Sequence, residues 1–221
     1  IGCRAIETSA RSAILMDIDN NRILYEKNIN EKRSVASISK IMTAVVAIES
    51  GKLDDIIVIG DEINSSYGSG IYIQIGEEIL LRDLVYGLML RSGNDAALAI
   101  AKYVGGSIEK FVDMMNEKLK ALGLADSAHF TNCVGLYDDN HYCTVYDMAV
   151  IMKAAIQNDL CREFLSKHTY TTAPTKEHPE GIEISNWFLR RIEDKDTGGE
   201  VLCAKTGYVV QSKNCAVSYG T

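Results

Sequence analysis

The sequence has little proline and no apolar run long enough to cross a bilayer. Only 2 of 221 residues are proline and 47% are hydrophobic, a composition typical of globular proteins and not of disordered or collagen-like ones. Residues 1–4 also lack the apolar core of a secretory signal, although a removed signal or anchor would leave no trace here. The length is about one and a half times the ~150-residue domain prior, which predicts a single domain over residues 1–221.

Positive charge is also scarce. Lys and Arg number 23 against 30 Asp and Glu, so the net charge is 23 − 30 = −7. No polybasic run of the kind that neutralises phosphates occurs in the sequence. Nucleic acid is therefore excluded as an expected partner.

The cysteines are too sparse for a disulfide scaffold, and no two form a C-x-x-C pair. This spacing predicts buried free thiols, no metal site and no cofactor. One pair is a candidate exception, because a turn centred near Val209 would place Cys203 and Cys215 opposite each other across two strands. The six cysteines are Cys3, Cys133, Cys143, Cys161, Cys203 and Cys215.

Strand signals lie near the two ends of the chain. Apolar runs at residues 13–18 and 22–26 flank Asp19–Asn21, whose side chains tolerate turn geometry, and this pattern predicts a β-hairpin. Further strands are expected at residues 201–203 and 215–219. A short strand is also expected at residues 56–59.

Helix signals dominate the middle of the chain. Apolar residues at helical spacing predict a helix from Ser37 to about Ile48 and another over residues 108–122, which ends at Gly123. A third helix is expected from Thr144, where Asp147 stands at the position of a capping-box acid. Together the elements predict an α+β fold with one antiparallel sheet built from both termini, at about 1–36 and 160–221. A mostly helical part is inserted at about 37–159.

Three short groups of residues carry recognisable chemistry: Ser37–Lys40, Ser92–Asn94 and Lys205–Gly207. Each group alone is weak, because Ser107–Lys110 is a second S-x-x-K and Ser212–Asn214 a second S-x-N. Their order and context distinguish the first set: a serine opening a helix, a Ser/Asn group at a helix junction and a Lys-Thr-Gly on a late strand.

The residue types in these groups suit acyl transfer. A serine in the first helical turn has Lys40, three residues on, along the same face, so the two can act as nucleophile and base. A lysine with an ordinary pKa near 10.4 is protonated at neutral pH, and burial or a nearby cation such as Lys205 must lower that pKa. Ser37 and Lys40 have a plain structural alternative, as a helix cap and a solvated lysine, which is what we expect of Ser107 and Lys110.

The chain resembles the serine D-alanyl-D-alanine carboxypeptidases, which are low-molecular-mass penicillin-binding proteins, over nearly its whole length. The resemblance implies a β-lactamase/transpeptidase-like fold and an extracytoplasmic location in the bacterial cell envelope, with the signal and any membrane anchor outside these residues. The expected partners are peptidoglycan stem peptides ending in D-Ala-D-Ala, and β-lactams as covalent inhibitors. The stretches that carry the resemblance are Ala36–Ala44, Leu90–Ala97, His141–Asp147 and Lys205–Tyr208.

On matching positions the resemblance implies Ser37 as the nucleophile that accepts the acyl group and Lys40 as its base. Ser92 is expected to relay a proton to the leaving amine, and Asn94 to hold the peptide amide of the substrate. The chain would thus remove the terminal D-alanine of a stem pentapeptide through an acyl-serine intermediate. His141 lies outside the three motifs and is interpreted as a structural or rim residue.

The late strand is expected to bind the substrate. The resemblance implies that Lys205 and Thr206 engage the terminal carboxylate, beside Gly207, which allows close approach. The backbone N–H groups of Ser37 and Tyr208 would form the oxyanion hole.

Departures from the family pattern keep two other functions open. The middle motif is Ser-Gly-Asn and no Glu-x-Glu-Leu-Asn segment is evident, which disfavours a class A-like β-lactamase; a β-lactam sensor that acylates without turnover is the other alternative. After Gly207 only 14 residues follow, where the resemblance implies a further strand and a closing helix, so weak activity is expected of these 221 residues. The aromatic pair Trp187–Phe188 is expected in the core rather than at a substrate rim.

Overall fold

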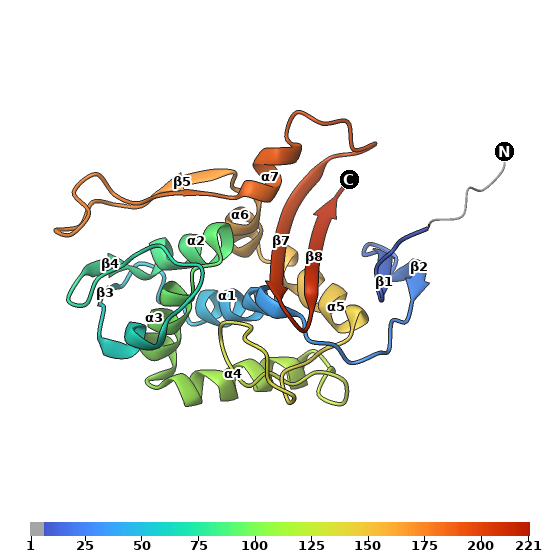
Figure 1. Ribbon diagram of the computed structural model, residues 1–221, viewed down its shortest axis with the longest axis horizontal. Coiled ribbons are helices and arrows are strands. Elements are labelled where there is room, and N and C mark those ends of the chain that lie inside the picture. Colours follow the sequence, from blue (N-terminus) through green and yellow to red (C-terminus); the bar gives the residue numbers. More distant parts are fainter. Residues whose placement is uncertain (1–6) are drawn as a thin grey trace.

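The computed structural model describes residues 7–221, and helices form its centre (Figure 1). Cys3 lies outside the described residues. The helical elements are η1 (Ala36–Ser39), α1 (Lys40–Glu49), η2 (Asp61–Ser65), α2 (Leu81–Arg91), α3 (Asn94–Gly105), α4 (Ile108–Ala121), α5 (Val145–Gln157), α6 (Asp159–Ser166) and α7 (Trp187–Ile192). The strands are β1 (Ala13–Asp17), β2 (Arg22–Lys27), β3 (Ile56–Val58), β4 (Glu78–Leu80), β5 (Thr169–Thr171), β6 (Glu183–Ser185), β7 (Val201–Val209) and β8 (Lys213–Gly220).

Helix α1 is the axis of the core. Every residue from Lys40 to Ile48 is buried, and α2, α3, α4, α5 and α6 all contact this helix. From Lys40 to Ile48 its sequence is apolar on all sides apart from Lys40 and Thr43, which is the pattern of a helix surrounded by protein. The start of α1 is therefore held in place by the whole helical part of the molecule.

Two helices begin at the residues expected from the sequence. At α4, the Ser107 hydroxyl accepts a hydrogen bond from the backbone N–H of Lys110 at 3.1 Å. At α5, Thr144 and Asp147 form a reciprocal capping box, each side chain accepting from the other's backbone N–H at 3.0 Å. The helix expected from Ser37 instead opens with the 3₁₀ turn η1 before α1 continues it.

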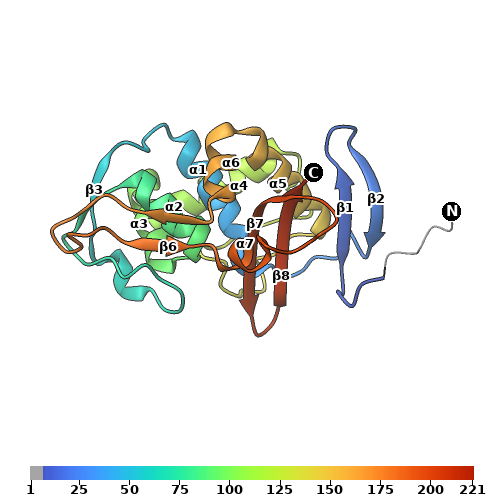
Figure 2. The same cartoon turned by 90° about the horizontal axis from the view of Figure 1, so that it is seen from above.

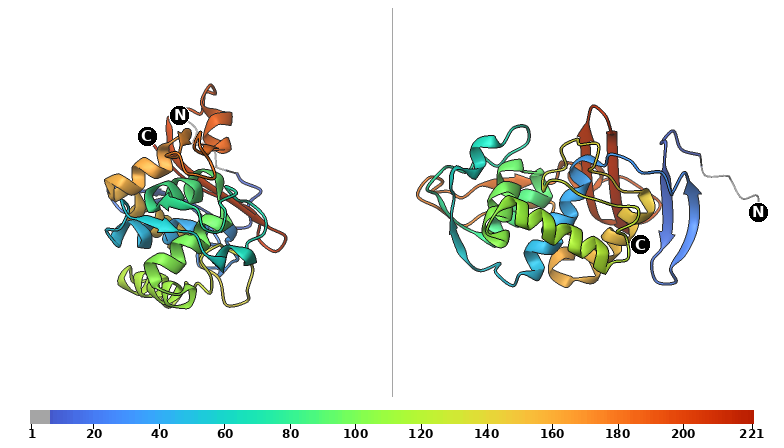
Figure 3. Two further views of the ribbon diagram at one scale, coloured as in Figure 1. Left: turned by 90° about the vertical axis from the view of Figure 1, so that its left-hand side faces the viewer. Right: turned by 90° about the horizontal axis from the view of Figure 1, so that it is seen from below.

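The α+β class is confirmed, but the terminal strands do not join into one sheet. Within residues 7–221 the strands form four separate two-stranded antiparallel sheets, among them β1–β2 and β7–β8. Figure 2 shows β1 beyond β8, separated from it, with the N-terminal hairpin at one end of the molecule. Both β1 and β8 contact α5, so each hairpin packs on a helix rather than on the other hairpin. The view from below in Figure 3 shows the same separation.

The register of the last hairpin overturns the candidate disulfide. Val209 pairs with Lys213, so the turn centres on Gln211, two residues later than the expected centre. Cys203 consequently pairs with Tyr219, and Cys215 pairs with Gly207. All five cysteines in residues 7–221 are free thiols, and four of them are buried, as the spacing predicted.

We therefore expect Cys203 and Cys215 to remain reduced. Mass spectrometry of the chain unfolded without reductant, in the presence of an alkylating agent, should find both cysteines alkylated. A peptide pair joined through these two residues would contradict the observed register.

Candidate active site

The first two site residues lie where η1 passes into α1. Ser37 is in the 3₁₀ turn and Lys40 is the first residue of α1. Because the two residues are three positions apart in a helical segment, their side chains lie on the same face. The Lys40 ammonium nitrogen lies 2.9 Å from Ser37 Oγ. Lys40 is only 1% exposed, among the most buried large side chains of the described chain. The pair is in direct hydrogen-bond contact, with Lys40 buried and Ser37 partly exposed.

Ser92 and Lys205 complete this group from distant parts of the chain. Ser92 follows α2 in a left-handed conformation, with φ of 58°, and its hydroxyl lies 3.2 Å from Lys40 Nζ. Lys205, on β7 and 4% exposed, donates to the same hydroxyl at 3.0 Å. Ser92 thus bridges the two lysines, and three segments far apart in sequence meet at one point.

Burial determines the charge of this group. The pKa of Lys40 is lowered well below its ordinary value, mainly by burial and further by the nearby cation of Lys205. Burial alone lowers the pKa of Lys205 to about 7. A buried ammonium is costly, and two such cations beside one hydroxyl repel each other. An uncharged Lys40 amine at neutral pH can therefore accept the proton of Ser37.

The second S-x-x-K provides an internal comparison. Ser107 caps α4, and Lys110 is exposed. No neighbouring segment buries the Lys110 side chain, and Ser107 is engaged as a helix cap. The same local sequence therefore lies in two different environments, according to what packs over the lysine.

Strand β7 runs past the first turn of η1 at very short range. A Cβ atom at Gly207 would lie 2.7 Å from the backbone nitrogen of Ser37 and 3.0 Å from that of Ile38, closer than real side chains allow. Only glycine permits this approach. Thr206 and Tyr208, on either side, are exposed. The strand edge is therefore open to a ligand beside the Ser37 hydroxyl.

Asn94 opens α3, directly after the turn that carries Ser92. Its side-chain amide donates to the backbone oxygen of Tyr67 at 2.6 Å. Its carbonyl oxygen Oδ1 is buried and has no hydrogen-bond partner within the described chain. A substrate amide could bind this acceptor only if the loop over it moved, so the expected role of Asn94 in holding the substrate stays a prediction.

The three motifs that meet in this site lie within the part of the chain that matches a known protein family. The family model described as D-alanyl-D-alanine carboxypeptidase, Peptidase_S11, matches residues 2–221. The chain belongs to this family. The match includes all three motifs, at Ser37–Lys40, Ser92–Asn94 and Lys205–Gly207.

Curated relatives in the carboxypeptidase family are longer than this chain. D-alanyl-D-alanine carboxypeptidase DacF of Bacillus subtilis is 32% identical over 211 residues, which cover 93% of this chain and 52% of the relative. DacA of Escherichia coli is 34% identical over 166 residues, which cover 69% of this chain and 40% of the relative. The chain spans about half the length of the first relative, or less of the second.

Solved structures of the family share the fold. The S96A mutant of the Streptomyces K15 DD-transpeptidase has a TM-score of 0.87 at 27% identity and covers 98% of this chain and 87% of its own. Penicillin binding protein 5 of Haemophilus influenzae has a TM-score of 0.86 at 28% identity and covers 100% of this chain and 63% of its own. The Streptomyces protein is named a transpeptidase, whereas the curated relatives are named carboxypeptidases.

A hydrogen-bonded chain of side chains holds the turn that carries Ser37. The N–H of Thr131 donates to His141 Nδ1 at 3.0 Å, so the ring proton lies on Nε2, 3.2 Å from Ser39 Oγ. Ser39 in turn donates to the carbonyl oxygen of Ala36 at 2.9 Å. Ala36 has φ of 50°, a strained conformation for alanine, and its carbonyl is thereby fixed.

His141 is therefore structural, as interpreted from the sequence, and it remains neutral. Burial lowers its pKa from 6.5 to about 4, against a smaller opposing effect of Asp138. A protonated ring could no longer accept from the Thr131 N–H. No local pattern indicated its partner Ser39, which lies inside the S-x-x-K motif itself.

The sequence also missed the residue that orders the loop facing Asn94. Asp95 is buried, and its carboxylate accepts from the backbone N–H groups of Ile71, Tyr72 and Ile73 at 2.8 to 3.3 Å. These bonds fix the loop whose Tyr67 carbonyl binds Asn94. An acid directly after an S-x-N motif is a signal that could have suggested this anchoring role.

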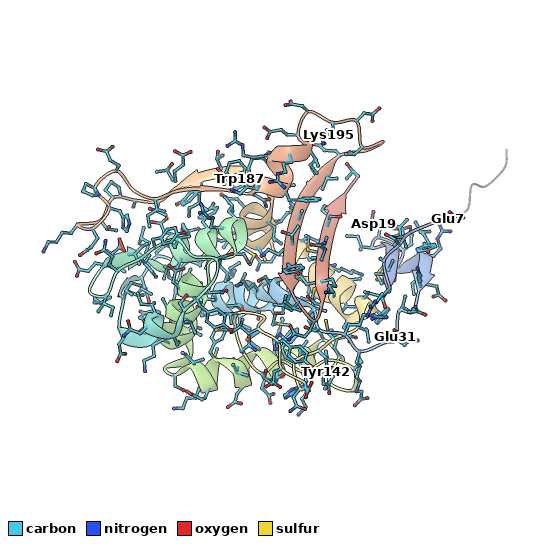
Figure 4. All side chains as sticks on the ribbon, viewed as in Figure 1. Glu7, Asp19, Glu31, Tyr142, Trp187 and Lys195 are labelled. Carbon is cyan, nitrogen blue, oxygen red and sulfur yellow. The ribbon has the colours of Figure 1, made fainter. Side chains whose placement is uncertain are left out.

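The prediction that Trp187 and Phe188 lie in the core is wrong for Trp187, and Phe188 is only partly buried. Trp187 is 56% exposed and stands at the start of α7, beside β7 and the root of the β5–β6 hairpin (Figure 4). It lines a cavity of about 260 Å³ together with Ser92, Lys205 and Thr206. The α7 helix buries Leu189 instead, so the indole lies at the rim of the site.

Residues 7–221 contain no group of three His, Cys, Asp or Glu side chains arranged to hold a metal ion. Over the same residues, no helix combines the length and apolar character of a membrane span.

Replacement of His141 by phenylalanine should change how stability depends on pH. In the native chain the folded pKa of about 4 lies below the unfolded value of 6.5, so the unfolded state binds the extra proton. Stability is complete above pH 6.5, and about 3 kcal/mol is lost as the pH falls to 4. Urea unfolding between pH 4 and 8 should show this loss in the native chain and not in His141→Phe.

A matched control uses the exposed histidine of the same region. His129→Phe should retain most of the native pH dependence, because burial, the main cause of the lowered pKa of His141, is unchanged in that variant. If the free energy of unfolding of the native protein and of His141→Phe depended on pH in the same way, a neutral buried His141 would be contradicted.

Proposed function

We propose that this chain is a serine-type D-alanyl-D-alanine carboxypeptidase, which removes the terminal D-alanine from peptidoglycan stem peptides. The observation that carries the proposal is the contact of Lys40 Nζ with Ser37 Oγ at 2.9 Å, in a buried group that includes Ser92 and Lys205. Family membership supports the same reaction. Such peptides lie outside the cytoplasmic membrane, and we infer an extracytoplasmic location from this substrate.

In this proposal Ser37 Oγ attacks the carbonyl carbon of the penultimate D-alanine, and Lys40 takes the hydroxyl proton. The backbone N–H groups of Ser37 and Tyr208 stabilise the oxyanion; the first N–H groups of a helix are free for such a role. Ser92, between the two lysines, returns the proton to the amine of the leaving D-alanine. Water then cleaves the acyl-serine ester and releases the shortened peptide.

The same proposal assigns the binding groups. Lys205 supplies positive charge and Thr206 a hydroxyl to the terminal carboxylate, next to the side-chain-free Gly207. The unpaired Oδ1 of Asn94 accepts from a substrate amide. A β-lactam acylates Ser37 because its amide occupies the position of the D-Ala-D-Ala bond.

Penicillin should add covalently to one serine. Intact-mass measurement should show one adduct on the native chain and none on Ser37→Ala. The second S-x-x-K gives the control: Ser107→Ala loses a helix cap, worth about 1 kcal/mol of stability, and should acylate as the native chain does. An adduct on Ser37→Ala would refute the assignment of the nucleophile.

Release of D-alanine from a diacetyl-L-lysyl-D-alanyl-D-alanine peptide distinguishes the related functions. A stable penicillin adduct without release would indicate a β-lactam sensor, whereas rapid loss of the drug would indicate a β-lactamase. Release that needs an added acceptor amine would indicate a transpeptidase, the activity named for the Streptomyces relative.

The pH dependence of kcat/KM should be bell-shaped. At low pH Lys40 becomes protonated and can no longer act as base. Above about pH 7 the free enzyme loses the charge of Lys205, so capture of the substrate carboxylate weakens. The alkaline limb of kcat should lie at higher pH, because a bound carboxylate favours the charged lysine.

A peptide with a terminal carboxamide is the control for this profile. It lacks the carboxylate that Lys205 would bind, so its slower cleavage should lose the alkaline limb near pH 7. An unchanged alkaline limb with the carboxamide would contradict the role of Lys205.

A further inference from the structure

The cavity beside Ser92 is larger than the proposed leaving group requires. Its volume of about 260 Å³ is roughly nine times the ~30 Å³ that a water molecule occupies in the liquid. The side chain of D-alanine is a single methyl group, similar in size to one water. The amine and carboxylate of a departing D-alanine would occupy part of this volume, and its methyl group would leave room for a larger side chain.

The residues around the cavity indicate which end of a substrate it faces. Ser92, Lys205 and Thr206 line it, whereas Ser37 and Asn94 do not. In the proposed reaction the first three act on the departing residue, through its amine and its carboxylate. The other two act on the acyl part that stays on the enzyme. The cavity therefore lies on the departing side of the scissile bond.

Apolar and cationic residues share the lining. Trp187 and Phe188 contribute aromatic surface, and Arg91 adds a second cation to that of Lys205. An amino acid with a free carboxylate and a large apolar side chain combines the two matching chemistries. The exposure of Trp187 is unfavourable, because a half-exposed indole keeps much apolar surface in contact with water.

The position of Trp187 is fixed by the fold. Asn186, directly before it, is buried and caps α7 by accepting from the backbone N–H of Leu189 at 3.1 Å. Its amide also donates to the Ala204 carbonyl of β7 at 3.4 Å. The guanidinium of Arg190 lies 5.6 Å from the indole centre. The indole is thus presented beside the strand that carries Lys205.

We propose that this cavity is a subsite for the side chain of the departing residue, and that Trp187 sets its preference. The chain then accepts peptides whose C-terminal D-residue is large and apolar, such as D-leucine, in addition to D-alanine. This inference rests on the proposed function, since it assigns the departing side of that reaction. Trp187 is a specificity-determining residue that contacts the ligand and takes no part in bond cleavage.

The kinetic test compares two peptides, diacetyl-L-lysyl-D-alanyl-D-leucine and the same peptide ending in D-alanine. The native chain should cleave the leucine peptide with kcat/KM within about tenfold of the alanine peptide. Trp187→Ala should lower the ratio of leucine to alanine cleavage by roughly tenfold, because the apolar contact is lost. Trp187→Phe, which keeps an aromatic ring, should restore most of the ratio.

A control variant removes an exposed aromatic residue elsewhere. Tyr146, on α5, is exposed and does not line the cavity, so Tyr146→Ala should leave the ratio unchanged. An unaltered ratio in Trp187→Ala, or a native preference for D-alanine above about a thousandfold, would overturn the proposal.

A binding measurement separates failure of the subsite from failure of the proposed function. Trp187 is the only tryptophan of the chain, so its fluorescence reports on this cavity alone. In the Ser37→Ala chain the leucine peptide should shift the emission to shorter wavelength, and the alanine peptide should shift it less. If the native chain releases no amino acid but the leucine peptide still shifts the emission, the subsite stands and the proposed reaction fails. No emission shift overturns the subsite, whatever the turnover.

Discussion

The arrangement of the site depends on two lysines buried around one hydroxyl. Lys40 and Lys205 both contact Ser92 Oγ, at 3.2 Å and 3.0 Å, and both are removed from water. Desolvation and mutual repulsion make two ammonium ions at this point unfavourable, so the neutral form of Lys40 is favoured. Packing thus gives an ordinary lysine the lowered pKa that the proposed role of Lys40 as a base requires.

Close backbone contacts make that packing possible. Gly207 lets β7 lie against the N–H groups of η1, and a Cβ at Gly135 would lie 2.2 Å from the Ala36 carbonyl oxygen. The chain from His141 through Ser39 to Ala36 then holds the strained turn before Ser37. These contacts come from β7 and from the loop between α4 and α5, both remote in sequence, so the position of Ser37 is set by tertiary packing.

The departing side of the cleft differs in character from the nucleophile side. Around Ser37 the surfaces are tightly packed backbone, whereas beyond Ser92 a cavity opens under the exposed Trp187. Tight packing suits a step that needs fixed atoms, and open apolar space suits discrimination among side chains. Chemistry and specificity would thus be carried by neighbouring but separate surfaces.

Local signals in the sequence determined the α+β class, the capped helices α4 and α5, both terminal hairpins and the three motifs that meet in the site. These features depend on neighbours within a few residues, through capping, turn geometry and helical spacing. The tertiary structure alone decided that Lys40 is buried while Lys110 is solvated, that Cys203 and Cys215 do not face each other, and that Trp187 lies at the rim. Each of these outcomes is set by which distant segment packs over a residue, and burial by remote segments leaves no mark on the local pattern.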